Sequence, residues 1–180
     1  MIIKGIDCGI SGGLCLLEDG KITLLKVMPT YETKTSKVLT SGKFKVNQMV
    51  DTDKLIDYFK GCSEAHIYVE KVHSVFGSSA SSNFSFGYNV GAIHATIRAL
   101  RMGFNLIPPK DWQKLVIIES DIVMKDEKKR DTKKTAANAA ARIFPDVDFR
   151  RTPRSKIAHD GMVDAALIAY AGYLIERSKK

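Results

Sequence analysis

The sequence predicts an α/β protein with a mixed five-stranded sheet, in which a three-stranded antiparallel meander continues into two parallel strands and helices flank the sheet. Residues 2–27 contain three short apolar runs separated by glycine turns. Two further apolar runs, at 65–70 and 104–108, each follow a segment with helical periodicity. At 180 residues, the chain has the length of one domain spanning residues 1–180.

Charge and composition restrict the classes of function. Lys and Arg outnumber Asp and Glu by 28 to 20, and the net charge of +8 favours a polyanionic partner. No apolar stretch is long enough to span a membrane, and the first residues lack the layout of a signal peptide. The three scattered cysteines form neither a zinc motif nor a disulfide framework. We therefore expect a cytoplasmic protein without a membrane partner.

The N-terminal segment predicts the antiparallel meander. Residues 2–7 form a buried strand that ends in Asp7, and a glycine-rich turn follows it. Residues 13–18 and 21–27 form the next two strands, and Asp19-Gly20 between them is a strong hairpin signal. Asp7 is thus expected at the tip of the first strand.

The segment after the meander has little periodicity. Residues 29–48 are rich in Thr, Ser and Lys, and we expect a mobile basic loop there. Such a loop either orders on a partner or is a plain solvated linker. Residues 51–60 predict a short amphipathic helix, with Gly61 as its C-cap.

A second buried strand also ends in an acid. Residues 65–70 are apolar and β-branched, and the run ends in Glu70. In α/β sheets, ligand sites collect at the carboxyl ends of strands, so Asp7 and Glu70 indicate a site. In the polar loop that follows, Lys71, His73 and Phe76 are candidate nucleic-acid contacts, with Phe76 as a stacking residue.

Residues 84–102 predict a long helix. Phe84 and Phe86 are expected to anchor it to the core. Gly87, Gly91 and Ala95 recur every four residues and form a ridge of small residues that permits a close approach. The partner at this ridge is either the sheet or a second protomer.

The next segment combines a strand, two helices and many charges. Residues 104–108 predict a strand, and Pro109 begins a short helix in which Trp112 is expected in the core and Lys110 is a candidate DNA contact. Residues 121–134 are dense in charge, and an alanine-rich helix follows at 132–144. Four cations then precede the last helix and suit phosphate binding, although a solvated basic loop is the alternative: Arg150, Arg151, Arg154 and Lys156.

The last helix, running from Asp160 to about Glu176, carries the decisive acids. Asp160 and Asp164 are four residues apart and share one helix face with an apolar stripe. Buried like charges are costly unless something compensates them, and a divalent metal ion does so. The alternative is that Asp160 is an N-cap and Asp164 favours the helix dipole.

Together, the four acids predict a metal-dependent nuclease site. Asp7, Glu70, Asp160 and Asp164 are expected both to be catalytic and to ligate Mg²⁺, two ions per site, with Mn²⁺ as a substitute. Two such ions activate a water and stabilise the leaving oxygen in phosphodiester cleavage. His159 adjoins the last pair and is a possible auxiliary ligand or proton-transfer group.

The sequence resembles the RuvC family of Holliday-junction resolvases, within the RNase H-like superfamily. Four segments carry the resemblance across nearly the whole chain: Gly5-Ile6-Asp7-Cys8-Gly9, Val69-Glu70-Lys71, Pro108 to Lys114, and His159 to Ala165. It implies an RNase H-like fold and the same four catalytic acids. It also implies a homodimer that makes paired Mg²⁺-dependent nicks in four-way or other branched DNA, without a small-molecule cofactor.

Two features depart from the family pattern. Cys8 stands where proline is common, and the last acidic pair is spaced by four residues, whereas typical bacterial resolvases space it by three. The spacing of four, the loop at 29–48 and the charged insertion near 117–131 resemble bacteriophage RuvC-like endonucleases, which implies a broader range of branched substrates. If the chain is phage-encoded, its compartment is the cytoplasm of the bacterial host.

Three alternatives remain open from the sequence. An RNase H-like nuclease acting on RNA–DNA hybrids or structured RNA would use the same acids. A sugar-kinase or actin-like ATPase also places an Asp and glycines after its first strand, but it needs two such domains and therefore a longer chain. A junction-binding protein with a degenerate site would bind DNA without cutting it.

Overall fold

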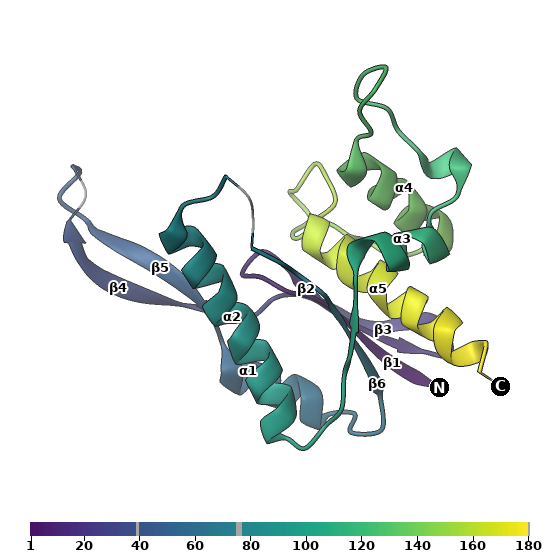
Figure 1. Ribbon diagram of the computed structural model, residues 1–180, viewed down its shortest axis with the longest axis horizontal. Helices are drawn as coiled ribbons and strands as arrows, with labels where there is room; N and C mark the ends of the chain where they lie inside the picture. The colour runs from purple at the N-terminus through teal and green to yellow at the C-terminus, as the bar shows by residue number, and fades with distance from the viewer. Residues whose placement is uncertain (39, 75–76, 180) are drawn as a thin grey trace.

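A computed structural model of the chain describes residues 1–38, 40–74 and 77–179. Its five-stranded sheet has the order β3-β2-β1-β6-β7 (Figure 1). Strands β1 and β2 pair antiparallel, as do β2 and β3, whereas β1, β6 and β7 run parallel. This arrangement confirms the predicted fold class. The strand bounds are Ile2–Asp7 (β1), Gly13–Glu18 (β2), Lys21–Val27 (β3), His66–Glu70 (β6) and Asn105–Ile107 (β7).

Helices cover both faces of this sheet. On one face, Ile6, Val69 and their neighbours pack on helices α1 (Thr52–Lys60) and α2 (Ala80–Ala99). On the other, Ile3 and Tyr68 belong to a core that includes helices α3 (Pro109–Val116), α4 (Thr132–Ile143) and α5 (Asp160–Arg177). A short 3-10 helix, Glu119–Asp121, precedes α4. Because strand side chains alternate between faces, Asp7 and Glu70 share the face of Ile3 and Tyr68, toward α5.

Helix α5 lies directly against the backbone of β1. A Cβ atom placed on Gly5 would come within 2.3 Å of the Ala165 carbonyl oxygen and 2.4 Å of the Ala169 nitrogen. A Cβ on Gly161 would lie 2.3 Å from the Ser11 carbonyl oxygen. Both positions therefore require glycine, since nothing but a hydrogen atom fits between the two backbones. These close contacts fix the distance between α5 and the end of β1.

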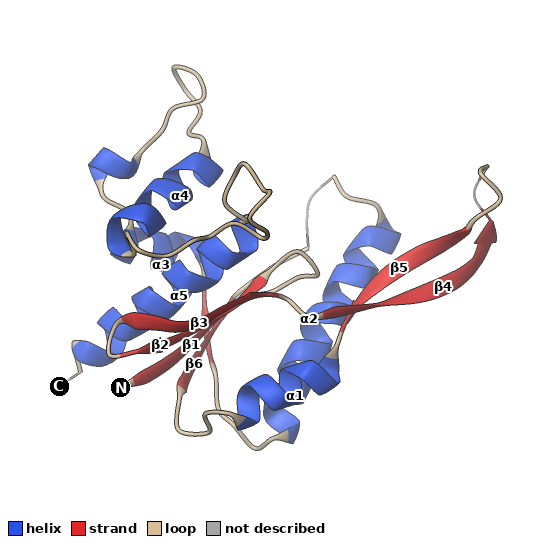
Figure 2. Cartoon of the chain, turned by 180° about the vertical axis from the view of Figure 1, so that it is seen from behind, coloured by secondary structure: helices blue, strands red, loops and turns tan. Residues whose placement is uncertain are grey.

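The expectation of a loop at residues 29–48 is wrong. Residues Thr30–Val38 (β4) and Phe44–Val50 (β5) form an antiparallel ribbon, which projects from the body in Figures 1 and 2. The register pairs Tyr31 with Met49 and Thr33 with Asn47. The apolar pattern is weak because most of the ribbon is exposed to solvent on both faces. Gly42, with φ of 77°, supplies the left-handed residue between the strands.

Helix α2 differs from its predicted bounds. It begins at Ala80 rather than residue 84, because the Ser79 hydroxyl accepts a hydrogen bond from the Ser82 nitrogen and caps it. The predicted anchoring role of Phe84 is wrong, since its side chain is 76% exposed, whereas Phe86 is half-buried. Among the described residues, nothing lies within 4 Å of a Cβ placed on Gly87 or Gly91, so the sheet does not cover this ridge.

The remaining helices follow their predicted bounds closely. Asp51 caps α1 through a hydrogen bond from the Lys54 nitrogen, and Gly61 ends it. Helix α3 starts on Pro109, and α4 and α5 match their predicted lengths within a few residues. In the described part of the chain, no helix combines the length and the apolar character needed to cross a bilayer.

Candidate functional site

The fold gathers the four predicted acids at one point. Asp7 and Glu70 end the adjacent parallel strands β1 and β6, which are in register at Ile6 and Val69. A hydrogen-bond interaction between the two carboxyl groups raises the pKa of Asp7 and lowers that of Glu70. Asp160 and Asp164 lie in the first turns of α5, and both repel charge on Asp7. Strand ends and a helix start thus converge, as the sequence predicts.

Burial and mutual repulsion shift the titration of this cluster. Burial, followed by repulsion from Glu70, Asp164 and Asp160, raises the pKa of Asp7 well above its usual value. Burial also raises the pKa of Glu70, against hydrogen bonds from Trp112 and Asp7 that lower it. The pKa of Asp164 is raised to about 7, by burial and then by repulsion from Glu70 and Asp160. The metal-free site therefore retains protons near neutral pH.

Two residues that the sequence did not assign to the site contact its acids. The buried Trp112 of α3 donates a hydrogen bond from Nε1 to Glu70 Oε1, at 3.1 Å. Lys133, in the first turn of α4, donates to Asp160 Oδ2 at 2.5 Å. This hydrogen bond and the charge of Asp160 raise the pKa of Lys133. Nothing in the sequence separates Lys133 from the other cations of the charged segment.

Two hollows meet at Asp160. The smaller one, of about 110 Å³, is lined by Glu70, Trp112, Lys133, Asp160 and Asp164, among others. The second, of about 300 Å³, is formed by Asp160 together with Ser11, Arg151, Ser155, Ile157, Ala158 and His159. A line that crosses both hollows passes from Arg151 to the carboxylates of Asp160, Asp164 and Glu70.

The predicted cations before α5 do not share one environment. Arg151 lines the hollow beside His159 and Asp160. Arg150 instead makes a two-pronged ion pair with Asp148, at 2.9 Å, and holds the pKa of that carboxyl at about 2. Arg154 and Lys156 are exposed on the same loop. The structure thus distinguishes Arg151 from its neighbour, which the sequence could not do.

The other candidate DNA contacts do not line the two hollows at Asp160, or lie outside the described residues. Lys71 and His73 are exposed just after β6. Lys110 lines a separate hollow with Lys114 and Arg130. Phe76 lies outside the described residues. None of these positions tests the predicted DNA contacts, which remain predictions.

His159, and not Asp160, caps α5. Its Nδ1 accepts a hydrogen bond from the Met162 nitrogen at 3.3 Å, so the alternative of Asp160 as the N-cap is wrong. Burial and the nearby Arg151 lower the pKa of His159, and a neutral ring is what acceptance at Nδ1 requires. Asp160 is left exposed at the first helical position, where it meets Lys133.

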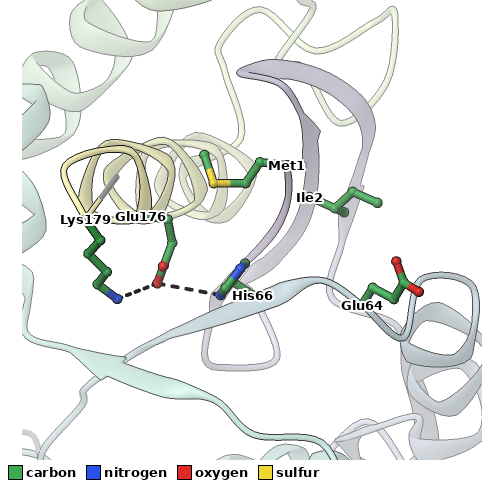
Figure 3. Close-up of a pocket in the computed structure, with 6 residues that line it drawn as sticks. All are labelled: Met1, Ile2, Glu64, His66, Glu176 and Lys179. Atoms are coloured by element: carbon green, nitrogen blue, oxygen red, sulfur yellow. Dashed lines mark hydrogen bonds and ion pairs between the residues drawn. The ribbon is translucent and has the colours of Figure 1, made fainter.

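A second cluster of charges lies at the opposite ends of β1 and β6. A pocket of about 450 Å³ is lined there by Met1, Ile2, Glu64, His66, Glu176 and Lys179 (Figure 3). Glu176 Oε1 accepts hydrogen bonds from Tyr68 Oη at 2.7 Å and Lys179 Nζ at 2.8 Å. Burial would raise the pKa of Glu176, but these bonds outweigh it and lower the pKa. We interpret this cluster as structural, since its acid is fully compensated.

The chemistry of the four carboxylates fits a hard divalent cation, because the set offers oxygen donors only and its repulsion calls for positive charge. As the side chains stand, no three His, Cys, Asp or Glu residues in the described ranges are arranged to hold a metal ion. Asp160 is engaged by Lys133, and Asp7 by Glu70. To bind a metal ion, Asp160 and Asp7 would therefore have to exchange their contacts with Lys133 and Glu70 for bonds to the ion.

The raised pKa values predict how the metal-free protein responds to pH. A carboxyl group whose pKa is higher in the folded state stabilises it fully below the unfolded pKa, about 4, and loses that contribution as the pH rises through the folded pKa. For Asp164 this window extends to about pH 7. Between pH 5 and pH 8 in the presence of a chelator, we expect the free energy of unfolding to fall by on the order of 2 kcal/mol, which lowers Tm by about 4–8 °C. Thermal melts of wild type and Asp164→Asn test this, and equal pH profiles for the two would contradict it.

Comparison with known proteins identifies the fold. No protein-family model matches the sequence, and no curated protein matches it. RuvC from Thermus thermophilus in complex with a Holliday-junction substrate superposes with a TM-score of 0.57 and 14% identity, over 99% of this chain and 96% of that one. The chain has the RuvC fold. A second Thermus thermophilus RuvC structure gives a TM-score of 0.52 at 14% identity, over 99% and 97% of the two chains. The predicted resemblance in fold is thereby confirmed.

Proposed function

We propose that the protein is a structure-selective DNA endonuclease that cuts Holliday junctions and related branched DNA by paired, metal-dependent hydrolysis of phosphodiester bonds. The observation that carries this proposal is the convergence of Asp7, Glu70, Asp160 and Asp164. Burial raises the pKa values of Asp7, Glu70 and Asp164, and repulsion within the cluster raises those of Asp7 and Asp164 further. The RuvC fold supports it, since one Thermus thermophilus RuvC with this fold is bound to a Holliday junction. We place the activity in the cytoplasm, that of a bacterial host if the chain is phage-encoded.

The residues divide the chemistry among them. The four acids would hold Mg²⁺, two ions per site, or Mn²⁺; when bound, these ions supply water activation and stabilise the leaving oxygen. Trp112 fixes the orientation of Glu70 through its indole N–H. Lys133 neutralises Asp160 in the metal-free site and, once Asp160 turns to the metal, would leave a cation beside the reacting phosphate. His159, with Nδ1 engaged in the cap, would hold or move a proton at Nε2.

A cleavage panel tests the proposed function. Four-way junction, fork, flap, linear duplex and RNA–DNA hybrid are incubated with Mg²⁺, Mn²⁺, Ca²⁺ or EDTA. We expect nicking of branched DNA with Mg²⁺ and Mn²⁺, and binding with little cleavage in Ca²⁺, whose looser coordination positions the water poorly. Undiminished cleavage in EDTA would overturn the metal-dependent mechanism. A preference for the RNA–DNA hybrid would favour an RNase H-like nuclease. Binding without cleavage would favour a junction-binding protein with a degenerate site.

Arg151 is expected to contribute more to DNA binding than Arg150. Arg151 lies in the hollow beside Asp160, whereas Arg150 already has a carboxylate partner. Arg151→Ala should weaken junction binding about equally for all sequences and reduce the slope of log K against log salt by about one. Arg150→Ala is the matched control and should leave the slope nearly unchanged. Gel shifts across a salt series measure the affinity and its salt dependence for each variant. Equal slopes for the two variants would contradict a larger role for Arg151.

We also propose a homodimer that uses the exposed face of α2. Phe84 and Tyr88 are exposed there, and the Gly87 and Gly91 positions are open to another backbone within the described structure. A two-fold dimer presents two sites to the two symmetric strands of a junction. Gly91→Leu should therefore convert the dimer to a monomer, whereas Ser85→Leu on the flank of the helix should not. Light scattering with and without junction DNA decides this, and a wild type that stays monomeric on DNA would refute it.

A further inference from the structure

The β4–β5 ribbon is a surface that the four-carboxylate site does not use. Figures 1 and 2 both show it projecting beyond α2, at the end of the molecule away from α3, α4 and α5. Its base is fixed to the body: Val50 is buried, and its nitrogen donates to Asn89 Oδ1 of α2 at 2.8 Å. The Asp51 nitrogen donates to the Pro29 oxygen at 2.9 Å and closes the base. The ribbon therefore projects from a base that is fixed to the body of the protein.

In the described part of the outer ribbon, apolar side chains are exposed that a stable pair of strands would normally bury. Its apolar side chains are 43–55% exposed: Tyr31, Val38, Phe44 and Val46. Phe44 and Val46 alternate onto the same face as the buried Val50, and Val38 pairs with Phe44 across the ribbon. An isolated two-stranded ribbon is marginal in water, so a partner that covers this face would stabilise it.

The charge of the ribbon indicates which partner fits. Residues 30–50 contain four lysines, one glutamate and six Ser or Thr residues. Among the described side chains, Lys34 and Lys43 are exposed. Lysines and hydroxyls are donors to phosphate oxygens, and a two-stranded β-ribbon fits the major groove of B-DNA. The nine residues of β4 span about 30 Å, or roughly nine base pairs of duplex.

We propose that the β4–β5 ribbon binds a double-stranded arm of the DNA substrate. Lys34 and Lys43 contact phosphates, while Val38, Phe44 and Val46 on one face of the ribbon rest against the groove. This inference rests on the proposed function and extends it, because it names duplex DNA away from the cleaved strand as a second binding region. One protomer would then contact the junction at two places: the cleaved strand at the carboxylate site, and a DNA duplex arm at the β4–β5 ribbon.

Binding measured in EDTA tests the ribbon apart from catalysis. Lys34→Ala/Lys43→Ala should lower the salt slope for duplex and junction DNA by about two, whereas the matched pair Lys21→Ala/Lys60→Ala, exposed elsewhere, should not. In a second variant, residues 33–47 are replaced by an Asn-Gly turn, which suits a tight hairpin and retains the base. Wild type should prefer junction arms of about 20 base pairs to arms of about 6, and the shortened variant should lose that preference.

The outcomes separate the two proposals. Unchanged slopes and an unchanged preference for long arms in folded variants would overturn the ribbon assignment. If the ribbon variants keep the salt dependence of DNA binding but lose the dimer in light scattering, the assignment is also overturned. The ribbon would then be a contact between two protomers. If wild type cuts no branched DNA while the ribbon variants still lose duplex binding, the proposed function fails and the ribbon assignment stands.

Discussion

Asp7→Asn is expected to lower cleavage of a four-way junction by about a thousandfold or more, the equivalent of several kcal/mol of lost charge stabilisation. The substituted side chain keeps its size, but it loses the carboxylate at the end of β1 that the other three acids surround. Junction binding should persist, because it depends on phosphate contacts elsewhere. Single-turnover cleavage with Mg²⁺, beside a gel shift in Ca²⁺, measures both effects.

The same variant has a signature in stability. Without metal, removing one buried, repelled carboxyl relieves its neighbours, so Asp7→Asn should melt at or above the wild-type temperature. It should also lose most of the stabilisation that Mg²⁺ gives wild type. Asp53→Asn, the same change on the exposed surface of α1, is the matched control and should cut normally. A folded Asp7→Asn protein that nicks within tenfold of wild type would remove Asp7 from the active site.

Gly5→Ala is expected to cost about 3 kcal/mol or more, or about 6–12 °C in Tm. The added Cβ would meet the Ala165 oxygen and the Ala169 nitrogen, which are backbone atoms that no side-chain rotation can move. Helix α5 must therefore shift as a body, and cleavage should fall further than the loss of folded protein explains. Gly103→Ala, with open space around the new Cβ in the described structure, is the control. A Gly5→Ala protein with wild-type Tm and activity would contradict this account of the β1–α5 contact.

The sequence predicted those parts of the fold that depend on local pattern. Strand β1 was recognisable as a short apolar run that ends at a glycine turn, and helix α5 because its apolar residues follow the period of a helix. Asp7 and Glu70 stood out because each ends such a strand, and the parallel pairing of β1 with β6 then places them side by side. The predicted convergence of the four acids followed from these elements alone.

Contacts between distant segments were not predictable in this way. Lys133 meets Asp160 only because α4 packs beside α5, and its own segment is a run of many charges. Lys4 interrupts a buried strand, yet its ammonium donates to the carbonyl oxygens of Tyr58, Phe59 and Cys62 at the end of α1. The β4–β5 ribbon escaped prediction because most of it is exposed on both faces, so β4 is largely polar and the apolar alternation is confined to a few residues of β5.

The bond between Trp112 and Glu70 also gives this protein a built-in optical probe. Trp112 is the only tryptophan in the chain, so its fluorescence comes from a single place, one hydrogen bond away from a candidate metal ligand. A change in the charge or protonation of Glu70 alters the field at the indole ring, and emission follows it without any attached dye. Occupancy of the carboxylate cluster is therefore measurable by titrating the protein with cations in the absence of DNA, before any strand is cut.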